Sequence, residues 1–234
     1  MGTYAVTDLH GQGWAWDAVK ARLKPEDHLF FLGDAIDRGP DGVRIMQELL
    51  ARPNTTYLMG NHERMMLDAL YLTNSPHAMQ LWNYNGGRAT QKALALLPFE
   101  EVVNIMQAVC KLPLRAEYTN PAGIHFVMTH SGVSEYDYEN PECLTEQDFL
   151  WDREHYCSHV EIPEDVRILH GHTPVPYLCK DGAGEEEKEL SWYSYNDDKK
   201  IDIDLGVHFT EVTCLFDLDV VGGEMIDEDT CINS

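Results

Sequence analysis

Short apolar runs of strand length recur in the first part of the chain, and each run stops at polar residues. Three of these runs cover residues 3–7, 28–32 and 55–59. Between them the apolar residues take the three-to-four-residue spacing of amphipathic helices, which end at Pro25 and Pro53. This order of strand, helix and strand predicts parallel strands joined by right-handed crossovers.

Beyond residue 61 the pattern is first helical and then strand-like again. The helices are expected at residues 65–70, 94–97 and 102–112. The later strand-like runs cover residues 114–118, 124–129, 167–169, 189–195, 200–204 and 212–218. We expect these runs to form a second sheet of mixed or antiparallel strands, and the chain to belong to the α/β (α+β) class. Residues 83–88 and 181–187 are expected as loops, and 227–234 as a frayed tail.

The residues that follow the strands carry the chemistry of metal ligands. The first run leads into Asp8 and His10, the second into Asp34, and the third into Asn61. Asp34 lies 26 residues after Asp8 and 27 before Asn61, which is about the length of one strand, crossover helix and next strand. The carboxyl ends of parallel strands meet at one edge of a sheet, where ligands bind in open sheets of this kind. We therefore expect these side chains to lie close together.

Two later runs end at histidine, one at His130 and the other at His170-Gly171-His172. The donors at the strand ends are Asp8, His10, Asp34, Asn61, His130 and one of His170 and His172. Such oxygen and imidazole donors suit Mn, Fe, Co, Ni or Zn, and suit Mg less well. One shared carboxylate would divide the donors into two sets. We therefore expect two divalent ions, with Mn first and Fe, Zn, Ni and Co as alternatives.

The neighbouring residues match the other needs of phosphoester hydrolysis. Paired metal ions lower the pKa of a bridging water, and the hydroxide formed near neutral pH can attack phosphorus in line. Arg38 offers a planar fork to phosphate oxygens, and His62 can donate a proton to the leaving alkoxide. Asp37 can hold His62 in its charged and oriented form. The alternative interpretation of Asp37 is a carboxylate that caps a turn.

The composition disfavours several other classes of protein. The chain has 234 residues and a hydrophobic content of 44%, enough for one well-buried core, and we expect a single domain over residues 1–234. Its net charge of -23 disfavours nucleic acid and anionic membranes as partners. There is no run of 18 apolar residues and no basic and apolar leader, and the six cysteines are scattered without a C-x-x-C pair. We therefore expect a cytosolic protein with reduced thiols.

The strand-end residues belong to five motifs that follow one another along the chain. They are Asp8-Leu9-His10-Gly11, Gly33-Asp34-Ala35-Ile36-Asp37-Arg38-Gly39, Gly60-Asn61-His62-Glu63, His130 and Gly171-His172-Thr173-Pro174. Their order and spacing resemble those of the calcineurin-like metallophosphoesterases, in particular the serine/threonine phosphoprotein phosphatases of the bacterial and bacteriophage lambda type. The resemblance extends from residue 5 to about residue 206. It implies a two-sheet β-sandwich flanked by helices.

The resemblance also implies a role for each site residue. One metal ion would be held by Asp8, His10 and Asp34, and the other by Asp34, Asn61, His130 and His172. His170 is then left as a strand-end residue. Trp151-Asp152-Arg153-Glu154 is similar to a Trp-Asn-Arg-Glu stretch of the family whose arginine contacts phosphate. The expected phosphate-binding residues are Arg38, Arg153 and Asn61, and the expected catalytic residues are His62 and Asp37.

Two positions depart from the family pattern. Thr7 stands where glycine is usual, and Met59 replaces the arginine that commonly precedes the Gly-Asn-His-Glu motif. We expect Thr7 to adjust only the backbone fit, and Met59 to remove a cation near the phosphate site. The expected metal ligands and His62 are intact, so we expect hydrolysis to survive.

These residues favour a metal-dependent phosphomonoesterase that acts on phosphoserine and phosphothreonine in proteins, with phosphotyrosine as a further substrate. The expected partner is a phosphoprotein or phosphopeptide, with small phosphoesters as a further class of substrate. The first alternative is a hydrolase of dinucleoside polyphosphates, which would need more cations than the acidic chain offers. A remote alternative is a scaffold that binds phosphoproteins without turnover, for which the loss of His62 or of a metal ligand would be the expected sign.

Overall fold

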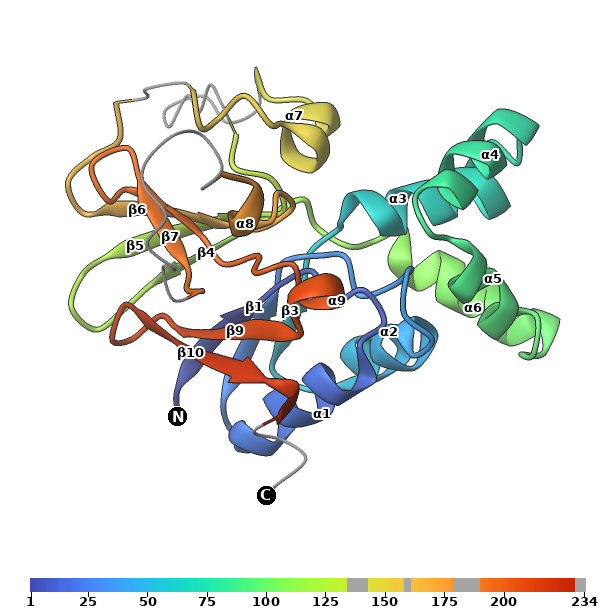
Figure 1. The fold of residues 1–234 in the computed structure, drawn as a ribbon, viewed down its shortest axis with the longest axis horizontal. Coiled ribbons are helices and arrows are strands. Elements are labelled where there is room, and N and C mark those ends of the chain that lie inside the picture. The colour runs from blue at the N-terminus through green and yellow to red at the C-terminus, as the bar shows by residue number, and fades with distance from the viewer. Residues whose placement is uncertain (134–142, 158–160, 179–189, 230–234) are drawn as a thin grey trace.

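The computed structural model describes residues 1–133, 143–157, 161–178 and 190–229. Within these ranges the chain forms two five-stranded sheets that lie one above the other, with a group of helices extending to one side (Figure 1). The expected two-sheet architecture with flanking helices is confirmed. No helix among the described residues is long and apolar enough to span a membrane.

The first sheet contains the strands that the sequence predicts to be parallel. Its strands in spatial order are β10 (Gly222–Asp227), β9 (Val212–Asp217), β1 (Thr3–Val6), β2 (His28–Phe31) and β3 (Thr55–Tyr57). β1, β2 and β3 are parallel, whereas β9 runs antiparallel to both β1 and β10. The crossover helices are α1 (Gly13–Arg22) and α2 (Gly42–Ala51), as the apolar spacing predicts.

The second sheet is mixed, as expected. Its strands in spatial order are β4 (Arg115–Thr119), β5 (His125–Thr129), β6 (Val166–His170), β8 (Lys200–Asp202) and β7 (Tyr193–Tyr195). β5, β6 and β8 are parallel, and the edge strands β4 and β7 run antiparallel to their neighbours. The described connections of this half contain three short helices, which are α7 (Glu146–Trp151), α8 (Val175–Leu178) and α9 (Val207–Thr210).

The alternation of side chains along the strands explains the layers. Ala5 of β1 lies in one apolar cluster with Phe126 of β5 and Leu169 of β6, so this cluster fills the space between the two sheets. The next residue of β1, Val6, points to the opposite face and packs with Trp16 of α1 in a second cluster. The layer between the two sheets is therefore apolar, and the candidate metal ligands come after the ends of the strands.

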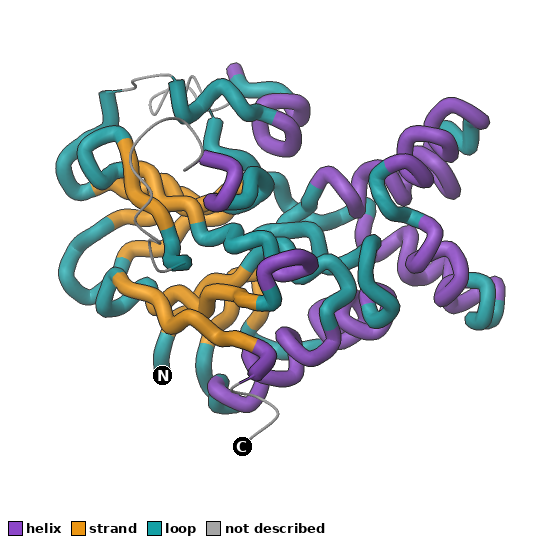
Figure 2. Tube along the Cα trace, viewed as in Figure 1, coloured by secondary structure: helices purple, strands orange, loops and turns teal. Residues whose placement is uncertain are grey.

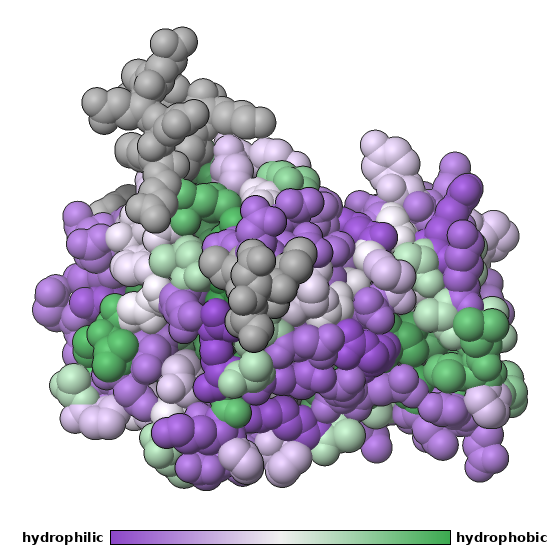
Figure 3. Space-filling model, turned by 60° about the horizontal axis from the view of Figure 1, so that its bottom comes forward, coloured by the Kyte–Doolittle hydropathy of each residue, from purple (hydrophilic) through white to green (hydrophobic). Residues whose placement is uncertain are grey.

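The remaining helices form an arm beside the sheets. They are α3 (Asn61–Leu67), the π-helical turn η1 (Asp68–Leu72), α4 (Pro76–Tyr84), α5 (Arg88–Leu94) and α6 (Phe99–Val109). Figure 2 shows the strands gathered at one end of the molecule and these helices at the other. Tyr84, Leu96 and Phe99 of this arm are more than four-fifths exposed. Figure 3 shows hydrophobic side chains at this end of the surface.

Some sequence predictions for the fold are wrong. The sequence places residues 212–218 in the second sheet, but β9 pairs with β1 in the first. Its side chains Cys214 and Phe216 face the layer between the sheets, so the alternation of apolar residues fits a strand of either sheet. The sheet to which β9 belongs is determined by its backbone hydrogen bonds with β1. The expected tail begins inside β10, and the expected loop at 83–88 shrinks to the turn between α4 and α5.

Other expectations fall partly outside the described residues. The expected hairpin loop at 181–187 lies outside them, as do the start of the expected strand at 189–195 and residues 230–234. Four of the six cysteines are described, and each of them is a free thiol, namely Cys110, Cys143, Cys157 and Cys214. Cys179 and Cys231 lie outside the described residues.

Candidate functional site

The fold brings the predicted ligands together at the carboxyl ends of the parallel strands. Asp8 and His10 follow β1, Asp34 follows β2, and Asn61 begins α3 after β3. His130 and His172 come from the second sheet, where they follow β5 and β6. All six side chains are buried.

The Asp34 carboxylate is shared by two groups of ligand atoms. Its Oδ2 atom lies 3.7 Å from His10 Nε2 and 3.5 Å from His130 Nε2. Atoms offered by His10, Asp34 and His62 lie within 4.8 Å of one another, and so do atoms offered by Asp8, Asp34 and His130. Asp8, the expected partner of His10, also lies close to the first group, with its Oδ1 atom 3.9 Å from His10 Nε2. A carboxylate common to two groups is well placed to bridge a pair of metal ions.

Asn61 and His172 lie against the second group. Asn61 Oδ1 is 3.0 Å from His130 Nε2. His172 donates its backbone N–H to Asp8 Oδ2 at 3.0 Å, and its ring centroid is 5.0 Å from that of His130. His170, which the spacing left as an equal choice, instead directs Nδ1 at a neighbouring backbone carbonyl 3.0 Å away. Of the two histidines, His172 is therefore the one that lies among the predicted ligands.

Six of the predicted site residues have a left-handed backbone. The φ angles are 51° at Asp8, 43° at His10, 60° at Asp34, 73° at Asp37, 64° at Arg38 and 74° at His172. Residues other than glycine seldom adopt this region, and they hold it where the surrounding structure determines it. The turns after β1, β2 and β6 thereby direct several side chains toward one small volume.

Glu63 holds two of these turns against each other. Its carboxylate accepts hydrogen bonds from the backbone N–H groups of Asp34 at 2.8 Å, Ala35 at 2.9 Å and Gly60 at 3.1 Å. The Tyr57 hydroxyl donates a fourth at 2.9 Å. Gly60 is required at this point, since a Cβ atom there would lie 2.2 Å from Asp34 Oδ1. Glu63 therefore fixes the Asp34 turn relative to α3.

Electrostatics favours a bound cation at this place. Burial raises the pKa of Asp34 well above its usual range, and the neighbouring Asp8 and Glu63 carboxylates raise it further. Burial also lowers the pKa of the nearby imidazoles, which are therefore neutral at pH 7, namely those of His10, His130 and His172. A divalent cation would offset the crowded carboxylates and bind the neutral rings. The donors present thus fit metal ions.

His62 forms a hydrogen-bonded pair with Asp37 next to this group. His62 Nδ1 lies 2.7 Å from Asp37 Oδ2, and because a carboxylate only accepts, Nδ1 carries the hydrogen. His62 Nε2 faces the ligands, 3.8 Å from Asp34 Oδ2. The Trp82 indole at 2.8 Å and the Thr90 hydroxyl at 2.5 Å also donate to the Asp37 carboxylate. The partners of Asp37 are thus side chains of α3, α4 and α5, which disfavours the turn-capping interpretation.

Arg38 lies at the exposed edge of the site. Its Nη2 atom is 3.5 Å from His62 Nε2, and its Nη1 atom is 3.1 Å from the ring nitrogens of His208. His208, on α9, packs edge-on against His10 with the ring centroids 5.4 Å apart. Burial, with Arg38 and His62 nearby, lowers the pKa of His208 to about 4. The neutral His208 ring can therefore accept a hydrogen bond from the guanidinium.

The remaining positions singled out by sequence are divided between the site and the core. Arg153 donates from Nε to His172 Nε2 at 3.4 Å, which places it beside the second ligand group. Met59 is 4% exposed and belongs to the apolar cluster on the outer face of the first sheet. The Thr7 hydroxyl donates to Asp8 Oδ2 at 2.5 Å. The expectation that Thr7 adjusts only the backbone fit is therefore wrong.

Sequence reasoning missed four side chains that organise the site, namely Glu63, Trp82, Thr90 and His208. Glu63 stands in a motif that the sequence singles out, but its role depends on complete burial, which the sequence does not show. Trp82 and Thr90 are separated from Asp37 by 45 and 53 residues, and His208 from Arg38 by 170. No local spacing could identify such distant partners.

Comparison with known proteins identifies the family to which this site belongs. The chain matches the family described as calcineurin-like phosphoesterase over residues 1–207. It therefore belongs to the calcineurin-like phosphoesterases, a family of phosphoester hydrolases. The predicted family, fold class and enzyme class are confirmed.

Two curated relatives differ in the substrates that their names state. Serine/threonine-protein phosphatase 2 of Escherichia coli (strain K12) is 28% identical over 154 residues, which cover 63% of this chain and 66% of that protein. Symmetrical bis(5'-nucleosyl)-tetraphosphatase of Acidovorax sp. (strain JS42) is 27% identical over 137 residues, which cover 57% of this chain and 44% of that protein. The chain thus spans less than two thirds of the length of either relative.

Two solved structures share the fold of this chain. A metallophosphoesterase from Sphaerobacter thermophilus aligns with a TM-score of 0.58 and 16% identity, covering 97% of this chain and 89% of that one. A protein serine/threonine phosphatase from Saccharomyces cerevisiae aligns with a TM-score of 0.58 and 13% identity, covering 97% of this chain and 80% of that one. At such low identity these similarities show the fold alone.

Proposed function

We propose that this chain is a metal-dependent phosphomonoesterase that acts on phosphoserine and phosphothreonine in proteins. The observation that carries the proposal is the Asp34 carboxylate, shared by two groups of ligand atoms beside the His62–Asp37 pair. The similarity to a protein named serine/threonine-protein phosphatase 2 supports the substrate class. A single domain and a cytosolic location remain predictions.

Two divalent ions would be held by the predicted ligands, which are Asp8, His10, Asp34, Asn61, His130 and His172. When bound, such ions supply an activated water near neutral pH. Manganese is the first expectation, because imidazole and carboxylate donors are mixed here without a thiolate, and Fe, Zn, Ni and Co are the alternatives. The protein's own contribution is to hold these donors rigidly, through the left-handed turns and the Glu63 hydrogen bonds.

The substrate phosphate would be held from two sides. Arg38 reaches the site next to His62, and Arg153 reaches it next to His172. A guanidinium donates two parallel hydrogen bonds to phosphate oxygens, so the pair can fix the orientation of the phosphoryl group. The Asn61 side chain, which begins α3, is the third phosphate-binding group that we assign.

His62 would donate a proton to the leaving oxygen of serine or threonine. Its Nδ1–H is held by Asp37, so Nε2 is the atom that faces the reaction. The carboxylate of Asp37 stabilises the protonated ring, which carries the proton on Nε2 before the leaving group departs. Trp82 and Thr90 keep that carboxylate in place.

The test is hydrolysis of p-nitrophenyl phosphate and of a phosphothreonine peptide by metal-stripped protein. The protein is titrated with Mn²⁺, Ni²⁺, Co²⁺, Zn²⁺ and Mg²⁺ in parallel. Activity on both substrates, restored by Mn²⁺, is the expected result. Two bound ions without turnover of either substrate would instead support the remote alternative of a non-catalytic scaffold.

The second candidate function is hydrolysis of dinucleoside polyphosphates. The observation that favours it is the similarity to a protein named symmetrical bis(5'-nucleosyl)-tetraphosphatase. The same metal-loaded protein is therefore given diadenosine tetraphosphate beside the phosphothreonine peptide. Preferential turnover of the dinucleotide would favour dinucleoside polyphosphate hydrolysis over protein dephosphorylation as the function.

A further inference from the structure

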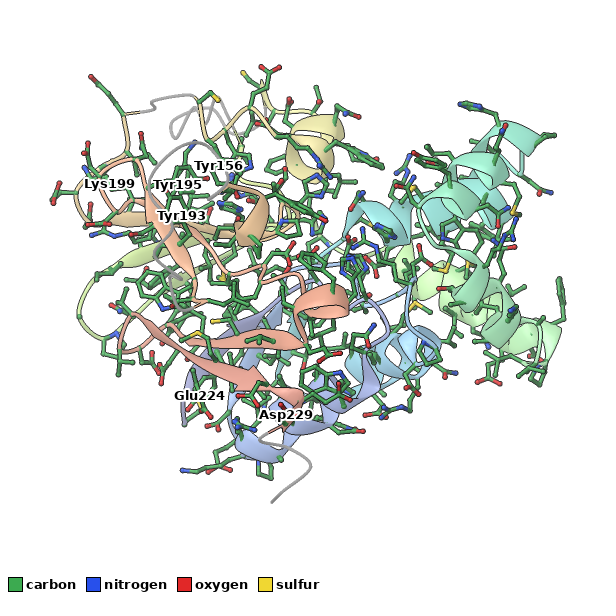
Figure 4. The ribbon with its side chains drawn as sticks, in the orientation of Figure 1. Tyr156, Tyr193, Tyr195, Lys199, Glu224 and Asp229 are labelled. Atoms are coloured by element: carbon green, nitrogen blue, oxygen red, sulfur yellow. The ribbon has the colours of Figure 1, made fainter. Side chains whose placement is uncertain are left out.

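A cluster of two buried histidines and one half-buried tyrosine behind the candidate site joins three segments of the chain. We call it the Tyr195 cluster, and it consists of Tyr195 on β7, His170 at the end of β6, and His155 in the segment after α7. Both histidines are completely buried. The Tyr195 hydroxyl lies between them, 2.6 Å from His155 Nδ1 and 2.8 Å from His170 Nε2. Figure 4 shows Tyr195 over the second sheet, together with Tyr156 and Tyr193.

The direction of each hydrogen bond in this cluster follows from the donors available. His170 Nδ1 lies 3.0 Å from the Gly171 carbonyl, which only accepts, so Nδ1 carries the hydrogen of this neutral ring. His170 Nε2 must then accept the proton of the Tyr195 hydroxyl. The hydroxyl oxygen is left to accept, so His155 donates its Nδ1–H to it. One hydroxyl thus bonds one nitrogen of each buried ring, and phenylalanine at this position would bond neither.

Each histidine of the cluster is attached to a segment that carries a predicted site residue. Arg153 lies two residues before His155, and His172 lies two residues after His170. The His155 ring also packs on Gly132, since a Cβ atom at Gly132 would lie 2.4 Å from His155 Nδ1. Gly132 follows the predicted ligand of β5 by two residues. Two of these segments therefore meet at the Tyr195 hydroxyl, and the third packs on the His155 ring.

Other hydrogen bonds hold the same segments without Tyr195. Lys200 donates from Nζ to the backbone carbonyls of Val133 at 3.0 Å and His155 at 3.4 Å. The Tyr156 hydroxyl donates to the Asp202 carboxylate. Loss of the Tyr195 hydroxyl should therefore leave the fold in place while it frees the two histidine rings to turn.

We infer that Tyr195 is a positioning residue of this site, whose hydroxyl sets the segments of Arg153 and His172 for binding of phosphate and of one metal ion. The inference rests on the proposed function. Arg153 and His172 are in contact, with 3.4 Å between Arg153 Nε and His172 Nε2. A shift of the segment that carries either residue would therefore displace the side chains of both. Tyr195 acts through these residues, because the partners of its hydroxyl are His155 and His170.

The test compares Tyr195→Phe with Tyr193→Phe as a matched control. The two tyrosines lie on one strand with their rings stacked 5.9 Å apart, but Tyr193 is 40% exposed and has no part in the cluster. The first measurement is calorimetric titration of the metal-stripped proteins with Mn²⁺. The second is the inhibition constant of inorganic phosphate. We expect Tyr195→Phe to weaken Mn²⁺ binding at one of two sites, and phosphate binding, by about 10-fold. Tyr193→Phe should match the wild type.

A double-mutant cycle shows whether the effect on phosphate runs through Arg153. In an Arg153→Ala background, Tyr195→Phe should cause little further loss of phosphate binding, because the group that it positions is absent. Full additivity of the two losses would show that Tyr195 does not act on phosphate binding through Arg153.

A second pair of variants tests His155, the residue that donates a hydrogen bond to the Tyr195 hydroxyl. His155→Asn keeps an N–H near the place of Nδ1 and should lose less affinity than His155→Ala.

Folded Tyr195→Phe protein with wild-type affinity for both Mn²⁺ and phosphate would overturn the inference. So would equal losses in Tyr193→Phe, because the loss would then be a general effect of the strand. Failure of the proposed function has a different signature, in which the wild-type protein binds Mn²⁺ but hydrolyses no phosphoester. The Mn²⁺ titration of Tyr195→Phe remains a valid test in that case.

Discussion

The Nδ1 atom of His62 lies 2.7 Å from an Asp37 carboxylate oxygen, to which the Trp82 indole also donates. Asp37 is completely buried and His62 is 2% exposed. The ring is therefore held by a fixed acceptor at one end and meets the site at the other. If His62 donates a proton to the leaving group, the effect of a His62 variant on the rate of hydrolysis should depend on which leaving group the substrate carries.

We predict that His62→Asn slows the hydrolysis of alkyl phosphates by about 100-fold or more, the usual contribution of a general acid. Aryl phosphates such as p-nitrophenyl phosphate should lose much less, because their leaving groups need no proton. Bound Mn²⁺ should remain at the wild-type level. Asp37→Asn should show the same preference for good leaving groups, and an equal loss on both kinds of substrate would contradict the proton-donor role.

Glu63→Gln should weaken both the fold and metal binding. The glutamine amide would place N–H groups against some of the backbone N–H donors that the carboxylate now accepts. We expect the free energy of unfolding to fall by about 1–3 kcal/mol, measured by urea denaturation of the metal-free protein. Tyr57→Phe, which removes only the hydroxyl donor, should cost less. Unchanged stability and Mn²⁺ affinity would show that the turn is held by other contacts.

His208→Phe tests whether His208 orients the phosphate-binding arginine. Phenylalanine keeps a ring against His10 but cannot accept a hydrogen bond from Arg38. We expect the KM for a phosphothreonine peptide to rise about fivefold, the equivalent of one hydrogen bond of about 1 kcal/mol, with a small change in kcat. Arg38→Ala provides the upper limit in the same assay. A wild-type KM would mean that Arg38 is positioned without His208.

The pH dependence of stability should reveal the buried Lys200. Burial lowers its pKa to about 8, below the value of about 10.4 for an exposed lysine. Between these two values the unfolded chain binds more protons at Lys200 than the folded chain does, so its contribution to stability rises with pH. Below pH 8 both states are protonated, and the destabilisation by the buried charge is complete.

The measurement is urea denaturation of wild-type and Lys200→Met protein at intervals between pH 7.5 and pH 10. The difference in the free energy of unfolding between the two proteins should change with pH over this window, as the burial penalty on the wild type disappears. Lys199→Met is the control for the loss of a neighbouring lysine, whose Nζ atom pairs with the exposed Glu164 at 2.9 Å. A difference that is constant with pH would contradict the lowered pKa.

The sequence predicts much of the site because its ligands follow strands in a regular order. Asp8, Asp34 and Asn61 could be placed side by side from the spacing of the strands and crossovers alone. The choice of His172 over His170 could not be made in this way, because both flank the same glycine. It depended on the resemblance to the family, and the structure places His172 against Asp8.

The parts that the sequence did not predict depend on pairing between distant segments. The side chains of β9 face a layer that both sheets share, so their alternation could not assign the strand to one of them. Arg153 lies on a polar segment without any local signal, so only the resemblance to the family singled it out, and the structure places it against His172. Glu63 is one of 40 acidic residues in the sequence, and its role in holding the Asp34 turn depends on its complete burial, which the sequence does not reveal.

The place of β1 between β2 and β9 has a consequence for the order of events during synthesis. Pairing with β2 is available once residue 31 has emerged, whereas pairing with β9 must wait for residues 216 and 217. A nascent chain that stops before β9 carries all the predicted ligands but lacks Cys214 and Phe216, which fill the layer beneath them. The predicted metal ligands would then lie at the edge of an incomplete sheet. Because domains generally fold as units, the site would not yet have its final geometry. Tight metal uptake would therefore begin only after β9 has been added.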